Sequence, residues 1–64
     1  MREAELRSRL DAHLGRAPAL MWAQTHVLGS LGHRTVDQAL SSGVPCKEIW
    51  RAAWAELELS DLHR

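Results

Sequence analysis

The side chains with the most reactive chemistry in this sequence are four histidines and one cysteine: His13, His26, His33, His63 and Cys46. Imidazole and thiolate groups are the usual ligands of tetrahedral zinc, and a cysteine beside a histidine can act as a nucleophile with its base. The sequence contains no Cys-x-x-Cys pair and no His-x-x-x-His pair, so the spacing supports no metal motif. We expect no metal and no cofactor, with His26 buried and hydrogen-bonded on its helix and His33 in a loop.

The length of the chain and its motifs also argue against an enzyme. A chain of 64 residues offers little room for a pocket that buries a substrate. The sequence contains no Gly-rich phosphate loop and no nucleophile elbow. We therefore expect a binding protein without catalytic activity.

A second pattern is typical of a helix-turn-helix. Ala39, Gly43 and Ile49 have the spacing of a small residue in the first helix, a left-handed turn residue and an apolar residue of the second helix. In a DNA-binding version, the second helix would present its polar and aromatic residues to the major groove: Lys47, Trp50, Arg51 and Trp54.

The charge balance opposes this DNA-binding interpretation. Eight Lys and Arg residues balance eight Asp and Glu residues, so the net charge is zero and offers no bulk attraction to nucleic acid or an anionic membrane. Glu48 and Glu56 lie in the helix that would contact DNA, and the same geometry joins any two packed helices. We expect another protein as the partner, and keep a DNA-binding helix-turn-helix protein, with weak DNA contact, as the alternative.

Three tryptophans are candidate anchors for that partner, since tryptophan is the leading hot-spot residue at protein interfaces. A core of this size cannot fully bury all three indoles, so we expect Trp50 in the core, and either a core or a partly exposed position for Trp22 and for Trp54. Arg34 is expected to pair with Asp37, or otherwise to reach a partner. The candidate interaction surface comprises Trp22, Arg34, Lys47, Trp50, Arg51 and Trp54.

These side chains must be positioned by four predicted helices, over residues 2–14, 18–31, 36–42 and 45–57. The first helix has a leucine stripe and is followed by Gly15. The second is predicted to be the central helix, because two apolar seams run along it, one of Leu20, Val27 and Leu31, the other of Met21 and Leu28. Gly32 is placed to end it.

The third predicted helix is short and begins with a capping box of Thr35 and Gln38, and Gly43 follows it. Ser60 and Asp61 could cap one more short turn near the carboxyl end. No segment alternates like a strand. The fold class is all-α: a single helical domain over residues 1–64, built as a compact bundle of three main helices plus one short helix. Its third and fourth segments form a helix-turn-helix-like pair.

The cysteine content and the hydropathy pattern place the protein in the cytoplasm. A single cysteine cannot form an intramolecular disulfide, which suits a reducing compartment. The opening residues lack the apolar stretch of a signal peptide. Residues 17–33 carry no Asp, Glu, Lys or Arg, but this stretch is too short and too polar to span a membrane.

Several blocks between His26 and Trp54 occur together at characteristic separations: His26-Val27-Leu28, Leu31-Gly32, Arg34-Thr35-Val36, Ala39-Leu40, Gly43 and Lys47-Glu48-Ile49-Trp50-Arg51-Ala52. With these blocks the sequence resembles, over nearly its whole length, a family of very short actinobacterial proteins known as domain of unknown function family number 3046. Members are often encoded next to the bacterial recombinase RecA and its regulator RecX. The resemblance implies a cytoplasmic helical protein linked to DNA maintenance, and it assigns no activity and no site residue.

Together, these observations predict a small protein–protein interaction or regulatory module, linked to DNA recombination or repair. The first alternative is the DNA-binding helix-turn-helix protein. The second is a homodimeric structural module that associates through the fourth predicted helix.

Overall fold

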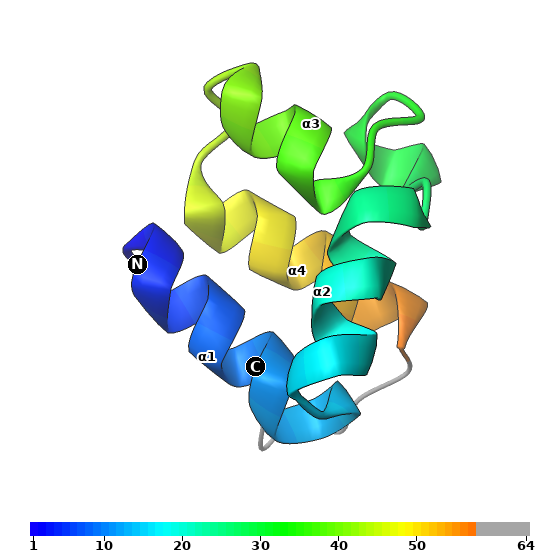
Figure 1. The fold of residues 1–64 in the computed structure, drawn as a ribbon. Coiled ribbons are helices and arrows are strands. Elements are labelled where there is room, and N and C mark those ends of the chain that lie inside the picture. Colours follow the sequence, from blue (N-terminus) through cyan, green and yellow to red (C-terminus); the bar gives the residue numbers. More distant parts are fainter. Residues whose placement is uncertain (58–64) are drawn as a thin grey trace.

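The computed structural model describes residues 1–57 and is helical throughout, with three main helices and shorter elements between them. The elements are α1 (Glu3–Leu14), α2 (Arg16–Thr25), the 3-10 turn η1 (Gly29–Leu31), α3 (Val36–Ser41) and α4 (Cys46–Glu56). In Figure 1, α4 crosses the middle of the molecule, where it contacts α1, α3 and η1, while α2 contacts α1 and α3. The all-α prediction is therefore confirmed, and the short turn predicted at Ser60 and Asp61 lies outside the described residues.

The first predicted helix is confirmed as α1, and Gly15 alone separates it from α2. Gly15 has φ +87°, in the region that disfavours a side chain, and its N–H donates to the carbonyl of Asp11 at 2.8 Å. On the outer side of α1, Arg7 pairs with Glu3 at 3.2 Å and Arg9 pairs with Glu5 at 3.1 Å. The chain therefore reverses within one residue and packs α2 directly against α1.

The second predicted helix is wrong in both its end and its buried side. It ends at Thr25 rather than at Leu31, and Ala19 and Ala23 are its buried residues. The predicted seam residues Leu20, Met21 and Val27 are exposed, by 54%, 60% and 49%. The central helix is α4 instead, which buries Ile49, Trp50, Ala52 and Ala53.

Local hydrogen bonds mark the end of α2. The hydroxyl of Thr25 donates to the carbonyl of Met21 at 2.8 Å, a contact within the last turn that slightly destabilises a helix. His26 is extended, with ψ 117°, and its N–H is the last to bond into the helix, at the carbonyl of Trp22. Leu28 then turns into the core and forms an isolated antiparallel bridge with Arg34. Gly32, with φ +70°, ends η1 rather than a long second helix.

The predicted capping box of the third helix is confirmed. The hydroxyl of Thr35 accepts from the N–H of Gln38 at 3.1 Å, and the Gln38 side-chain oxygen accepts from the N–H of Thr35 at 2.9 Å. Gly43 follows α3 with φ +84°, as a left-handed turn requires. These local signals mark the start of α3 and the turn into α4.

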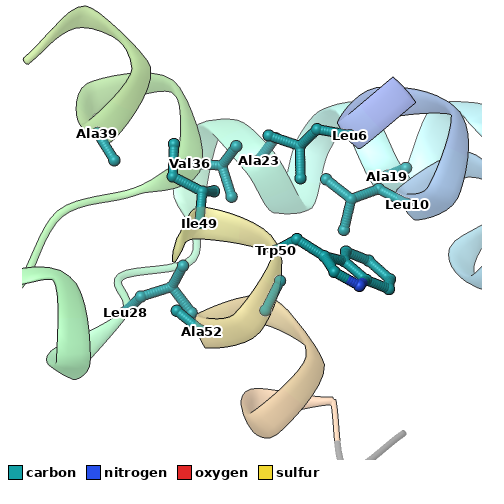
Figure 2. Close-up of a cluster of buried hydrophobic side chains, with 11 residues drawn as sticks. Leu6, Leu10, Ala19, Ala23, Leu28, Val36, Ala39, Ile49, Trp50 and Ala52 are labelled. Carbon is teal, nitrogen blue, oxygen red and sulfur yellow. The ribbon is translucent and has the colours of Figure 1, made fainter. Parts of the chain in front are cut away.

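The core lies where α4 meets the other helices. Its largest fully buried side chains are Trp50, Leu6, Leu10, Leu28, Ile49 and Val36. Figure 2 shows the Trp50 indole extending from α4 toward Leu10 of α1, with Val36 beside Ile49 and Leu28 beside Ala52. One apolar side of α4 therefore joins α1, the 26–35 loop and α3 into a single cluster.

The contrast between Leu6 and Leu20 gives a direct test of this packing. Replacing the fully buried Leu6 by alanine should lower the free energy of unfolding by about 2–5 kcal/mol, because the truncation leaves a cavity. Since a domain of this size has only ~3–5 kcal/mol of stability, much of the Leu6→Ala protein should be unfolded. Leu20→Ala should change stability by under ~0.5 kcal/mol. Urea unfolding followed by circular dichroism would measure both, and a large loss in Leu20→Ala would contradict the packing of α2.

Thr35 gives a second test, of the capping box. Thr35→Ala removes the acceptor for the Gln38 N–H and should lower the free energy of unfolding by about 0.5–2 kcal/mol. Ser41→Ala, at an exposed position near the other end of α3, is the matched control and should have little effect. Equal losses in the two variants would show that the cap does not stabilise α3.

Candidate interaction surfaces

The six residues of the predicted interaction surface do not form one surface. Lys47, Trp50 and Arg51 line a common hollow between α1 and α4, whereas Trp22 and Arg34 lie on other parts of the molecule. Trp54 is half-buried and packs against the core cluster. Trp50 is in the core as predicted, with 1% of its surface exposed, so α4 cannot present it outward to DNA as the helix-turn-helix interpretation required.

Trp22 is half-buried and is used within the molecule. Its ring stacks on that of His26, with 4.9 Å between the centroids and 11° between the planes. Nε2 of His26 lies 2.8 Å from Oε1 of Glu56. The His26 side chain is 38% exposed, so the prediction of a buried histidine within the helix is wrong. These contacts connect the end of α2 to the last turn of α4.

The prediction that Arg34 pairs with Asp37 is also wrong. Nη2 of Arg7 donates to Oδ1 of Asp37 at 2.8 Å, so Asp37 is paired with α1 instead. Nη1 of Arg34 donates to the carbonyl of Leu31 at 3.2 Å and supports the loop. The hydrogen bond to Asp37, with a smaller contribution from Glu3, raises the pKa of Arg7 above its ordinary value, although partial burial opposes the shift. The ion pair attaches α3 to α1 across 30 residues of sequence.

The hollow between α1 and α4 has a volume of about 310 Å³ and a mainly charged lining: Met1, Glu5, Arg9, Lys47, Trp50 and Arg51. The guanidinium carbon of Arg9 lies 5.5 Å from the centroid of the Trp50 ring, a cation–π distance. His13 stacks against the same indole at 5.9 Å. Side chains of α1 therefore cover the indole, and cationic groups surround the hollow. We name this feature the basic hollow.

A second surface was missed by the sequence analysis. A groove of about 510 Å³ runs between α1 and α2, and its lining is mostly apolar: Arg7, Leu10, Asp11, Arg16, Ala17, Ala19, Leu20 and Ala23. Leu20 lines this groove and is 54% exposed, and Met21, the next residue along α2, is 60% exposed. The signal in the sequence was the pair Ala19 and Ala23, since small residues four apart allow α1 to approach closely and turn their larger neighbours outward. We name this feature the apolar groove.

Metal-binding clusters and membrane-spanning helices are absent from residues 1–57. In that part of the chain, no group of three or more His, Cys, Asp and Glu side chains is placed to hold a metal ion. Cys46 is a free, half-buried thiol at the start of α4. None of the described helices has the length and apolar character needed to cross a membrane.

Comparison with known proteins gives one match. A family model described as "Protein of unknown function (DUF3046)" matches residues 1–61 of the chain. Neither the curated proteins nor the solved structures contain a match.

The different environments of the tryptophans can be measured by fluorescence. A Trp22→Phe/Trp54→Phe variant retains only the buried Trp50, which should be shielded from acrylamide and emit at short wavelength because water does not reach the indole. A Trp50→Phe/Trp54→Phe variant retains only the half-buried Trp22 and should be quenched several-fold more strongly. Equal quenching of the two variants would place Trp50 on the surface, contrary to the structure.

Proposed function

The chain belongs to the DUF3046 family of proteins of unknown function, and on that premise we propose that it is a small, non-enzymatic protein-binding module. Its apolar groove receives an amphipathic helix of another protein. The exposure of Leu20, which lines that groove and is 54% exposed, is the observation that carries the proposal.

The composition of α2 supports a binding role for its outer side. Arg16 is its only charged residue, in a chain of which a quarter is charged. Depletion of charge is typical of the centre of protein interfaces. Leucine and methionine side chains each contribute about 1.5–3 kcal/mol when fully buried, so covering Leu20 and Met21 would stabilise a complex.

The shape and size of the groove favour a helix as the occupant. A groove between two packed helices accepts the side chains of a third helix at spacings of three and four residues. The ten residues of α2 extend only about 15 Å. A surface of that length is too small to bury the ~800 Å² that each partner contributes to a standard interface. A short helical segment therefore fits this surface better than an extensive dimer does.

The charges at the groove favour a partner helix with both signs of charge on its flanks. Arg16 and Asp11 line the groove and are not engaged in an ion pair among the described residues. Arg7 also lines the groove, but it is already paired with Glu3 and Asp37. We expect the partner to place an acidic side chain at Arg16 and a basic side chain at Asp11, which fixes the direction of the bound helix.

A homodimer through α4 is a less favourable arrangement. The apolar side of α4 is committed to the intramolecular core, where Ile49, Trp50, Ala52 and Ala53 are buried. Only half-buried residues such as Trp54 and Leu57 are left for a second copy. Self-association remains an outcome that the experiment below distinguishes.

A regulatory role in DNA recombination or repair, in the cytoplasm, is the finer part of the proposal. It is supported by the family context, since members are often encoded beside a recombinase and its regulator. The identity of the protein that occupies the apolar groove therefore tests this part separately.

Site-specific photo-crosslinking in the cells that produce the protein would test the proposal. A photoreactive residue at position 21 should give one discrete crosslinked product, because the exposed Met21 directly follows the groove residue Leu20 in α2. Leu20→Glu should reduce that product at least tenfold, since a charge would be buried in the contact. The same photoreactive residue at the exposed position 41 of α3 is the control and should give none of it.

Each outcome of that experiment is informative. Mass spectrometry should locate the crosslink in an amphipathic helix of the captured protein. No product at position 21, or one that Leu20→Glu leaves unchanged, would overturn the groove as a docking site. A product of twice the chain's mass would show a homodimer instead. A captured helical partner outside recombination and repair would contradict only the finer assignment.

A further inference from the structure

The basic hollow carries an inference that is independent of the proposed protein-binding function. We infer that this hollow binds a phosphate group, held between Arg9 of α1 and both Lys47 and Arg51 of α4. The hollow does not share a lining residue with the apolar groove.

The three cationic groups come from two helices and face one space. Lys47 and Arg51 are four residues apart and therefore lie one turn from each other on the exposed side of α4. Neither forms an ion pair among the described residues. Arg9 approaches from α1 and closes the other side of the hollow. Three cations at one concave surface are the groups that bind phosphate oxygens best, since guanidinium and ammonium groups form charge-assisted hydrogen bonds with them.

Arg9 is held in place before any ligand binds. Its guanidinium lies over the Trp50 ring at 5.5 Å, and its Nη2 donates to Oε2 of Glu5 at 3.1 Å. Trp50 itself is fixed in the core, with 1% of its surface exposed. Arg9 therefore loses little conformational freedom when it binds an anion, and its remaining N–H groups can reach the ligand.

The local charge of the hollow differs from the zero net charge of the chain. Among residues 1–57, Glu5 is the single carboxylate in the lining, against three cationic side chains. Other acidic residues are taken up elsewhere, with Glu3 and Asp37 on Arg7 and Glu56 on His26. Glu48 lies in a neighbouring hollow on the other side of Arg51, where it lines the surface with Ser30 and Leu31. The basic hollow is therefore locally positive although the whole chain is neutral.

The buried state of Trp50 decides what part of a ligand is recognised. An indole that is 1% exposed cannot stack on a nucleobase, so the site binds the phosphate group and does not recognise the base. A phosphodiester in a nucleic-acid backbone and a free phosphate or pyrophosphate share this chemistry. The hollow, at about 310 Å³, is at the small end of ligand sites, which suits a single phosphate group.

Titration of the full-length, isotope-labelled protein by nuclear magnetic resonance would test the inference. The probes are pyrophosphate, a short single-stranded oligonucleotide and a short duplex, each at low salt. The side-chain N–H signals of Arg9 and Arg51 and the backbone amides around Lys47 should shift. The Lys47→Gln/Arg51→Gln variant should bind at least tenfold more weakly, and the slope of log affinity against log salt for the single strand should fall by about 1.4 in magnitude.

Matched variants separate this site from general electrostatics and from the apolar groove. Arg16→Gln removes a positive charge outside the hollow, at the apolar groove, and should leave phosphate binding nearly unchanged. Glu5→Gln removes a carboxylate that lines the hollow and should strengthen binding several-fold. Leu20→Glu should retain binding, so a failure of the protein-docking proposal would not affect this one. Circular dichroism would verify that each variant is folded, as expected for substitutions on exposed side chains.

The outcomes divide clearly between support and contradiction. Binding of pyrophosphate without DNA supports a site for a free phosphate, and binding of the oligonucleotides without pyrophosphate supports a backbone contact. Absence of binding by all three probes at low salt would overturn the inference. So would binding that Lys47→Gln/Arg51→Gln leaves intact.

Discussion

Burial of the Trp50 indole is the interaction on which the rest of this small structure depends. It is the largest fully buried side chain, and it joins α4 to α1 next to Leu10. A domain of this length buries only about 60% of the surface of its unfolded chain, so one indole accounts for much of its core. The buried indole also determines how the basic hollow is built. Arg9 and His13 lie against its ring, and Lys47 and Arg51 remain exposed at the same hollow.

The distribution of small residues explains why the protein has an apolar groove. Ala19 and Ala23 fill the side of α2 that faces α1, and their size brings the two helices close together. The larger Leu20 and Met21 are then directed away from the core. A core built around α4 and completed by alanines has no space for these side chains, and the groove beside them remains available to a partner.

The features of the fold that depend on local interactions were predicted correctly from local patterns in the sequence. The capping box at Thr35, the ends of helices at Gly15 and Gly43, and the bounds of α1 and α4 each depend on residues within one turn of one another. The length of the second helix was overestimated because Val27, Leu28 and Leu31 fit a helical period as well as they fit a loop. Only Leu28 of these three is fully buried, and tertiary packing determines which of them enters the core.

The candidate surfaces depended even more on tertiary contacts. Arg34 and Asp37 are neighbours in sequence, yet Asp37 pairs with Arg7, which is 30 residues away. Similarly, the basic hollow exists because Arg9 approaches α4 from another helix. Spacing along one helix predicted Lys47 and Arg51 as exposed charges. The composition gives a net charge of zero, and it does not show that both residues line one locally positive hollow.

The one-residue connection at Gly15 has a consequence for how the sequence can vary in length. The side of α2 that faces α1 is set by where the helix restarts, and each residue of helix adds about 100° of rotation. An insertion or deletion at Gly15 would therefore turn Ala19 and Ala23 away from α1 and bring different side chains to the groove. Length variation in related chains should accordingly be absent between α1 and α2.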